Sequence, residues 1–308
     1  MALGRWMLDA FGQVRIEKHW VQVEGHRMHS LKAGLGPDLI LVHGLLGTAS
    51  AWDPVIPHLA EKSTVYAVDA LGLGESDRVP GIDASLEAQA GRLVAFMDES
   101  GIPSADFLAT SHGGAVMLAL AAKYPARVNS LLLHAPANPY SLLGDPLINF
   151  YLSGLGRWFA HRVPTLPVPM QSLALGRMYG DPTQLRDGSL GKYIGSLRVP
   201  GTVNYILSIL RTWYADMAKL KAELDHVRQI PALLLWGDRD RAVSMESGQE
   251  LRRYFDRVEF QVLPGTGHLP YEECPETLGG LVNSFLSKMR GGMREAGPQL
   301  VRSKAQPA

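Results

Sequence analysis

The stretch "FLATSHGGAVML", Phe107 to Leu118, places Ser111 where an apolar run that predicts a strand meets the start of a predicted helix. A sharp strand-to-helix turn can hold a serine hydroxyl clear of the backbone and beside a backbone N–H, as acyl transfer requires. Such a turn crowds the residues two before and two after the serine, which must therefore be small. Gly113 meets that demand, and Ala109 adds one methyl group. The pentapeptide alone leaves two interpretations open, in which Ser111 is a nucleophile or only caps the helix.

Predicted strands and helices alternate on both sides of this stretch, from about residue 38 to 136 and again from about residue 229 to 290. Runs such as "DLILVHG" and "PALLLWGDRD" begin with continuous apolar residues, which is typical of strands buried on both faces of a sheet. The alternation predicts an α/β fold in which helices flank a mostly parallel central sheet. We therefore expect one core domain made of two separate parts, residues 1–136 and 229–290.

Residues 137–228 differ from both flanks, because their pattern predicts short helices joined by turns. We expect this segment to cover the sheet as an inserted helical cap or lid. The alternative is an all-helical subdomain with no role in binding. Several of its aromatic side chains are expected to line an apolar pocket, and the others to fill the core of the segment itself. These aromatic residues are Tyr140, Phe150, Tyr151, Trp158, Phe159, Tyr179, Tyr205, Trp213 and Tyr214.

The two ends of the chain lie outside the alternating pattern. Apolar residues at helical spacing predict an amphipathic helix over about residues 3–14. Its apolar stripe is expected to dock on the protein itself or on a partner subunit, so a homo-oligomer stays open. A membrane surface is the weaker alternative, because the polar face of this helix is poor in Lys and Arg. Residues 291–308 have no apolar periodicity and are expected to form a disordered tail.

The composition excludes several classes of protein. Lys plus Arg and Asp plus Glu both number 30, so no net charge draws the chain to nucleic acid. No run of 18 apolar residues is present, which predicts that no transmembrane segment exists. The one cysteine, Cys274, cannot form an intramolecular disulfide, which fits a cytoplasmic protein, and we expect it to be a packing residue. No spacing of His, Cys, Asp and Glu suggests a metal site.

A second motif, "LVHGLLGTASAW", ends a predicted strand at His43 and Gly44. A glycine at a strand end lets the next N–H turn toward the space above the edge of the sheet. The N–H groups of Leu45 and His112 are therefore expected to form an oxyanion hole, which stabilises the negative oxygen of an acyl-transfer intermediate. The alternative is a common strand-to-helix turn, and the His43 side chain is expected to be structural.

An acid and a base follow two later predicted strands. The motif "LLLWGDRDRAVS" offers Asp238 and Asp240 as acids that could orient a histidine, and the residues alone leave this choice open. In "LPGTGHLPYEECPE", His268 lies in a loop between a strand and the last helix. Loops that follow parallel strands gather at the carboxyl edge of the sheet. Ser111, the acid and His268 are therefore expected to meet at that edge, in Ser…Asp…His order along the chain.

Together these motifs resemble the α/β-hydrolase superfamily over about residues 20–290. "HGLLG" resembles the oxyanion loop of that family, "DALGLGESD" its Asp-x-x-Gly-x-Gly-x-Ser loop and "GHLPYEECPE" its histidine loop. "WGDRD" resembles the family's Trp-Gly-x-x-Asp acid loop, which implies that Asp240 is the orienting acid. The resemblance further implies Ser111 as the nucleophile and His268 as the base. Ala109 is the one departure from the family pattern, and some lipases of the family share it.

The resemblance implies a serine esterase, similar to carboxylesterases and lipases, that cleaves small-molecule esters with apolar acyl or aryl groups and needs no cofactor. Epoxide hydrolases and haloalkane dehalogenases carry an aspartate at the nucleophile position, so Ser111 argues against both. Cofactor-free haloperoxidases usually have an aromatic residue after the oxyanion His-Gly and little cap, so Leu45 and the long insertion argue against them. Two alternatives remain open: a carbon–carbon bond hydrolase of a ring-cleavage pathway, and a ligand sensor without turnover.

Overall fold

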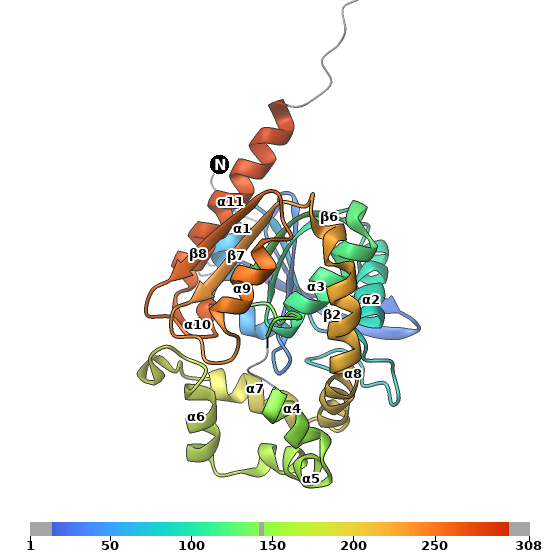
Figure 1. Ribbon diagram of the computed structural model, residues 1–308, viewed down its shortest axis with the longest axis vertical. Coiled ribbons are helices and arrows are strands. Elements are labelled where there is room, and N and C mark those ends of the chain that lie inside the picture. Colours follow the sequence, from blue (N-terminus) through green and yellow to red (C-terminus); the bar gives the residue numbers. More distant parts are fainter. Residues whose placement is uncertain (1–13, 142–144, 296–308) are drawn as a thin grey trace, which may run out of the picture.

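The computed structural model describes residues 14–141 and 145–295 (Figure 1). The strands are β1 (Ile16–Val23), β2 (His26–Ala33), β3 (Asp38–Val42), β4 (Thr64–Val68), β5 (Ala105–Thr110), β6 (Val128–His134), β7 (Ala232–Gly237) and β8 (Val258–Leu263). The helices are α1 (Ile56–Ala60), α2 (Leu86–Glu99), α3 (His112–Lys123), α4 (Asp145–Leu152), α5 (Gly154–Arg162), α6 (Val168–Gly176), α7 (Ser189–Leu197), α8 (Thr202–Glu223), α9 (Met245–Arg252), α10 (Pro270–Glu273) and α11 (Pro275–Glu295). The helix predicted over residues 3–14 lies, except for Val14, outside the described residues.

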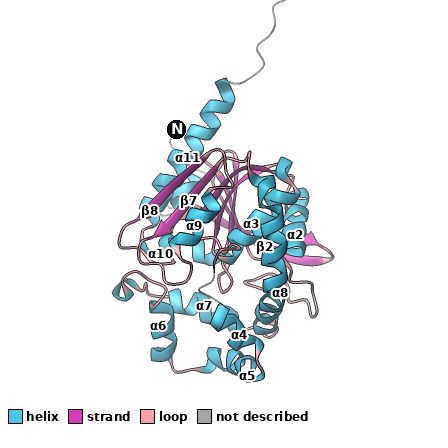
Figure 2. Ribbon diagram, in the orientation of Figure 1, coloured by secondary structure: helices cyan, strands magenta, loops and turns pink. Residues whose placement is uncertain are grey.

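One eight-stranded sheet forms the centre of the protein, in the order β1-β2-β4-β3-β5-β6-β7-β8 (Figure 2). β2 pairs antiparallel with both β1 and β4, whereas every other neighbouring pair is parallel. The mostly parallel sheet predicted from the sequence is thereby confirmed. Because β3, β5, β6, β7 and β8 run in one direction, the loops that follow them gather at one edge of the sheet.

Apolar side chains pack into a separate layer on each face of the sheet. Successive residues of a strand point to opposite faces. Ile40 of β3 therefore belongs to one layer, and its neighbours Leu39 and Leu41 belong to the other. The first layer includes residues of α2 and α3, and the second includes residues of α1 and α11 (Figure 1). Strands such as β4 and β7 are buried along their whole length, which explains their continuous apolar sequences.

Helices α4 to α8, called the helical segment below, are inserted between β6 and β7, within the residues predicted to form the cap. Figure 1 shows α4 to α7 grouped beyond the sheet, whereas α8 runs back alongside α3. Residues of the segment, including Ile148, Leu197 and Ile206, form an apolar cluster together with Leu73 and Ala84 of the core domain. Among its aromatic residues Tyr179 and Tyr205 are buried.

The last helix, α11, extends past the predicted start of the C-terminal tail. Residues 291–308 are expected to be disordered, but α11 continues to Glu295, so the predicted start of the tail is wrong. Extending an existing helix adds one hydrogen bond for each residue fixed, which offsets the low helix propensity of two glycines at 291 and 292.

In the described part of the chain, no helix has the length and apolar character to cross a membrane.

Candidate active site

Ser111 lies in the turn between β5 and α3 with φ 53° and ψ −124°. A residue with a side chain rarely adopts a positive φ, and holding it there costs about 1–3 kcal/mol. Hydrogen bonds fix this conformation, because the Ser111 N–H donates to the carbonyl oxygen of His134 at 3.1 Å and the Ser111 carbonyl accepts from the N–H of Ala137 at 2.9 Å. The Ser111 side chain makes no capping hydrogen bond to α3, which argues against the helix-cap interpretation.

Small residues around Ser111 let β3, β5 and α3 approach one another closely. A Cβ atom on Gly113 would lie 2.4 Å from the carbonyl oxygen of His43, so only glycine fits that position without a shift of the backbone. Ala109 is fully buried in β5, in register with Val42 of β3 and Leu133 of β6. The single methyl group of Ala109 is accommodated in the first apolar layer, which also contains Leu133.

His268 and Asp240 form a buried pair in the loops that follow β8 and β7. The Nδ1 atom of His268 lies 2.7 Å from Oδ2 of Asp240, and the two side chains are 6% and 1% exposed. The other carboxylate oxygen of Asp240 accepts hydrogen bonds from the N–H groups of Ala242, at 2.8 Å, and Val243, at 3.1 Å. Asp238, by contrast, is exposed, so the structure pairs His268 with Asp240.

Burial and hydrogen bonding act in opposite directions on Asp240. Burial raises the pKa of its carboxyl group, but the charge of His268 and the hydrogen bond to it, helped by His134 and the Ala242 N–H, lower that pKa below its ordinary value of 3.8. Asp240 is therefore ionised at neutral pH and can accept the Nδ1–H of His268. That hydrogen bond leaves Nε2 of His268 as the nitrogen that can take up a proton.

His134, at the end of β6, lies between Ser111 and His268 and was not singled out in the sequence. Its carbonyl accepts from the Ser111 N–H, and its ring centroid lies 5.8 Å from that of His268. No hydrogen bond joins the Ser111 hydroxyl to His268 within the described residues. Such bonds are often long or absent in unliganded enzymes and tighten when substrate binds. A histidine at the carboxyl end of a strand next to β5 is the signal that could have identified His134.

The histidines nearest Ser111 are electrically neutral. Burial, with a smaller effect of the neighbouring His268, lowers the pKa of His134 to about 3. Burial, with a smaller effect of His43, likewise lowers the pKa of His112 to about 3. Burial also lowers the pKa of His43 below its ordinary value of 6.5. The immediate surroundings of Ser111 therefore carry no positive charge from these three side chains at neutral pH.

The loop after β3 lies against Ser111, as expected for an oxyanion loop. A Cβ atom on Gly44 would lie 3.2 Å from Cβ of Ser111 and 3.7 Å from its hydroxyl oxygen. In the described part of the chain, neither the Leu45 N–H nor the His112 N–H donates to a backbone carbonyl, so both donors remain available. The His43 ring supports this loop through two polar contacts. Its Nδ1 lies 2.8 Å from the Gly44 carbonyl oxygen, and its Nε2 lies 3.3 Å from the Ala70 N–H nitrogen.

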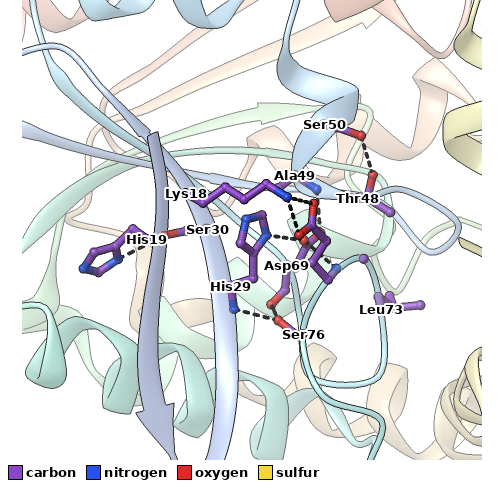
Figure 3. Close-up of polar contacts among 12 residues, drawn as sticks. Lys18, His19, His29, Ser30, Thr48, Ala49, Ser50, Asp69, Leu73 and Ser76 are labelled. Carbon is purple, nitrogen blue, oxygen red and sulfur yellow. Dashed lines mark hydrogen bonds and ion pairs between the residues drawn. The ribbon is translucent and has the colours of Figure 1, made fainter. Parts of the chain in front are cut away.

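A second buried acid–histidine pair, His29 and Asp69, lies beside Ala49 (Figure 3). Nδ1 of His29 lies 2.7 Å from Oδ2 of Asp69, and both side chains are 2% exposed. The other oxygen of Asp69 accepts from the Ala49 N–H at 2.6 Å. Thr48, the residue before the short 3₁₀ helix Ala49–Trp52, makes no side-chain capping hydrogen bond. Asp69, the first residue of the "DALGLGESD" motif, therefore caps this helix in place of Thr48.

Two glutamates that follow His268, neither of them predicted from the sequence, join its loop to the helical segment. Glu272 is buried and accepts hydrogen bonds from three hydroxyl groups. These hydroxyls belong to Tyr179, Ser189 and Tyr193. Glu273 accepts from the N–H groups on both sides of His268, those of Gly267 at 3.0 Å and Leu269 at 3.2 Å, and from the Gly180 N–H at 2.7 Å.

Other polar residues show no catalytic arrangement. The Cys274 sulfur lies 3.7 Å from the Thr266 hydroxyl, and burial raises the pKa of its thiol, which agrees with a packing role. No group of three or more His, Cys, Asp or Glu side chains that could hold a metal ion occurs in residues 14–141 and 145–295.

Comparison with known proteins agrees with the fold. The family model described as "alpha/beta hydrolase fold" matches residues 37–275, more than half of the chain. A pimeloyl-[acyl-carrier protein] methyl ester esterase of Nitrosomonas europaea is 28% identical, covering 81% of this chain and 95% of that protein. A 2-hydroxy-6-oxo-2,4-heptadienoate hydrolase of Pseudomonas putida is 27% identical, covering 82% of this chain and 90% of that protein. Among solved structures, a membrane phospholipase A has a TM-score of 0.75 at 25% identity, over 89% of this chain and 87% of that chain. On the strength of the family match over most of its length, the chain belongs to the α/β hydrolase family.

Proposed function

We propose that this α/β hydrolase is a serine hydrolase that cleaves carboxylic esters. The observation that carries the proposal is the strained Ser111, held at φ 53° at the sheet edge where His268 and Asp240 form a buried pair. A strained backbone that raises a hydroxyl beside two unused N–H groups serves no purpose in stabilising the fold. The same arrangement suits nucleophilic attack on an acyl carbon.

The proposed reaction proceeds through an acyl-enzyme. The Ser111 hydroxyl attacks the acyl carbon while Nε2 of His268 takes up the hydroxyl proton, and the N–H groups of Leu45 and His112 stabilise the oxyanion. Asp240 accepts the Nδ1–H of His268 and stabilises the resulting imidazolium. The intermediate collapses as His268 protonates the leaving alcohol. Water, deprotonated by His268, then releases the acid and restores Ser111. None of these steps requires a cofactor.

The neutral surroundings of Ser111 favour an uncharged ester with apolar groups. His43, His112 and His134 are uncharged at neutral pH for the reasons given above. Among the described residues Arg92 is the only buried Lys or Arg, and its guanidinium donates to the Asp83 carbonyl. A neutral ester therefore leaves no charge unpaired at the site, whereas a buried anionic group would lack a partner.

A carbon–carbon bond hydrolase is the second candidate. It is supported by the Pseudomonas putida relative, whose name states hydrolysis of a 2-hydroxy-6-oxo-2,4-heptadienoate. The esterase relative from Nitrosomonas europaea supports the ester at a similar identity. The two candidates share the nucleophile and differ in the charge of the substrate, so direct assay of both substrate types decides between them.

We further propose that the helical segment acts as a cap over the site. It meets the site at two places, since the His268 N–H donates to the Met178 carbonyl at 2.7 Å and the Trp213 ring centroid lies 6.2 Å from that of His112. A cap placed there would exclude water and supply apolar contacts to the substrate. The single cysteine favours a reducing compartment, so we propose that the protein acts in the cytoplasm.

The test is steady-state turnover of p-nitrophenyl esters of graded chain length. Ser111→Ala is expected to lower kcat/KM about 10³-fold or more with the fold intact. Ser100→Ala is the matched control, because Ser100 ends α2 and its hydroxyl has no hydrogen-bond partner in the described part of the chain. Near-normal turnover by Ser111→Ala would remove the nucleophile assignment.

Two further outcomes separate the alternatives. Faster consumption of a 2-hydroxy-6-oxo-dienoate than of any ester, also lost in Ser111→Ala, would assign the carbon–carbon hydrolase. A single stoichiometric burst with every substrate would assign the ligand sensor, because acylation would then occur without release.

A further inference from the structure

Large apolar side chains are exposed on one part of the protein far more than elsewhere. Six that are more than half exposed lie on the three helices α4, α5 and α6. They are Leu147, Leu155, Trp158, Val168, Met170 and Leu173. Elsewhere in the described residues, only Leu35 is a large apolar side chain that is more than half exposed. Apolar side chains scattered singly need no explanation, but such a concentration marks an interaction surface.

The same pattern of residues occurs on α5 and on α6. On α5, Leu155, Trp158 and Arg162 are spaced i, i+3 and i+7, so they lie on one face of the helix. Met170, Leu173 and Arg177 repeat that spacing along α6 and the residue that ends it. Each helix thus presents two exposed apolar side chains and an arginine at its C-terminal end. We call these six residues the apolar–arginine face.

The charge around this face is positive, although the whole chain is neutral. From residue 146 to 180 the sequence contains three arginines, Arg157, Arg162 and Arg177, and no Lys, Asp or Glu. The formal net charge of the chain is +0, so this excess is local. The Arg162 guanidinium lies 5.3 Å from the centre of the Trp158 ring, which places a cation beside an exposed aromatic side chain.

We propose that the apolar–arginine face docks on a lipid bilayer that carries anionic phospholipids. An interfacial helix buries apolar side chains, often including Trp and Leu, at the boundary of headgroups and acyl chains, while its basic side chains reach the phosphates. Arg162 and Arg177, each at the C-terminal end of its helix, meet that requirement. The inference goes beyond the proposed reaction and does not depend on the role of Ser111.

Two other occupants fit the face less well. In a symmetric dimer the same surfaces meet, so the arginines of one copy would approach the arginines of the other. The N-terminal segment would have to reach the face from Val14, which packs with the apolar layer that includes residues of α1 and α11. Figure 1 shows the N-terminal end of the described chain and α11 at the opposite end of the molecule from α5.

The test is co-sedimentation of the full-length protein with vesicles of phosphatidylcholine alone or of phosphatidylcholine and phosphatidylglycerol in equal amounts. We expect binding to the anionic vesicles that weakens as salt is added, and much weaker binding to the neutral vesicles. Arg162→Gln with Arg177→Gln should weaken binding to anionic vesicles about 25-fold, roughly fivefold for each arginine. Leu155→Ser with Leu173→Ser should weaken it about tenfold or more.

Two controls make the result specific. Leu35→Ser removes a leucine outside the face that is also more than half exposed, and it should leave binding unchanged. Ser111→Ala should bind vesicles as the unmodified protein does, so a failure of the proposed reaction and a failure of docking can be told apart. All variants are checked for folding by circular dichroism, and the Leu and Arg variants also by turnover of a soluble short-chain ester.

Three outcomes would overturn the proposal. The first is no binding of the unmodified protein to anionic vesicles. The second is binding that the leucine and arginine substitutions leave unchanged, because the contact would then lie elsewhere in the chain. The third is a concentration-dependent dimer, seen by light scattering, that Leu155→Ser with Leu173→Ser abolishes in a protein that does not bind vesicles.

Discussion

Within the described residues, two buried aspartate–histidine pairs have the same geometry and different surroundings. In both pairs, Nδ1 of the histidine lies 2.7 Å from Oδ2 of the aspartate. The His268–Asp240 pair adjoins the turn that strains Ser111. The His29–Asp69 pair lies under Trp20, whose ring centroid is 4.6 Å from that of His29, and the remaining nitrogen of His29 is buried without a partner in the described part of the chain.

The difference teaches that the pair itself does not define a catalytic site. The two pairs differ in the surroundings of the histidine Nε2 atom and in whether a serine with a strained backbone lies nearby. Asp69 instead uses its second oxygen to fix the Ala49 N–H, and its own carbonyl accepts from the Ser76 hydroxyl at 2.8 Å. The His29–Asp69 pair thus joins β2, the oxyanion loop and the glycine-rich loop. We therefore expect substitutions in one pair to alter turnover and substitutions in the other to alter stability.

The largest expected effect tests the first half of this comparison. Asp240→Asn should lower kcat/KM for esters about 10⁴-fold, because His268 would lose the acceptor that orients its ring and stabilises its cation. Asp238→Asn, in the same loop but exposed, is the matched control and should have little effect. Steady-state assays of both variants check this, and the reverse ranking would assign the acid role to Asp238.

The second effect tests the other pair. Asp69→Asn should lower the free energy of unfolding by about 3 kcal/mol, because it breaks a buried pair and weakens the cap on the Ala49 N–H. Asp77→Asn, in the same loop, loses a solvent-accessible ion pair with Arg27 but keeps a side-chain oxygen that can accept the Arg27 N–H, and should cost less than about 1 kcal/mol. Urea unfolding measures both. A stable Asp69→Asn protein with turnover lowered as far as in Asp240→Asn would contradict the comparison.

A third prediction concerns His134, the buried neutral histidine next to the His268–Asp240 pair. The pKa of His134 is lowered from 6.5 to about 3 in the folded protein, so the unfolded chain takes up this proton first as the pH falls. Stability is therefore complete above pH 6.5 and decreases between 6.5 and about 3, by roughly 1 kcal/mol per pH unit for this group.

The measurement is urea unfolding at several pH values below 6.5. His134→Gln should show a shallower loss of stability with falling pH than the unmodified protein. His26→Gln is the control, because His26 begins β2, and three strands lie between β2 and β6 in the sheet. Equal slopes for His134→Gln and the unmodified protein would show that His134 is not held neutral.

The smallest effect sharpens the description of the His268 loop. Glu273→Ala should lower kcat about tenfold and change KM little, because the N–H groups that flank His268 would lose their acceptor and the ring would be held less closely. Glu273→Gln keeps an acceptor oxygen and should recover part of the loss. Glu276→Ala, an exposed acid in α11, is the control. An unchanged kcat in Glu273→Ala would limit its role to structure.

The sequence predicts well what short local patterns determine. Continuous apolar runs identify the buried parallel strands, and the position of a residue just after such a strand places it at the carboxyl edge. Ser111 and His268 follow from this reasoning. The preference for Asp240 over Asp238 required the family resemblance, since two acids three residues or fewer from the same strand end look alike in sequence.

The sequence does not reveal contacts that depend on distant parts of the chain. His29 and Asp69 come together only because β2 pairs antiparallel with β4, which ends just before Asp69. The partners of Glu272 lie near α6 and α7, and no local pattern links a glutamate to those hydroxyls. His134 is an intermediate case, because its place at a strand end is local information that could have been used.

The backbone at Ser111 has a consequence for how the sequence came to be selected. At φ 53° and ψ −124° a glycine would sit without strain, so a sequence selected for stability alone would have glycine at this position. The serine makes the folded state less stable than a glycine at this position would make it. Its presence is therefore a trace of selection for something that a more stable protein would lack.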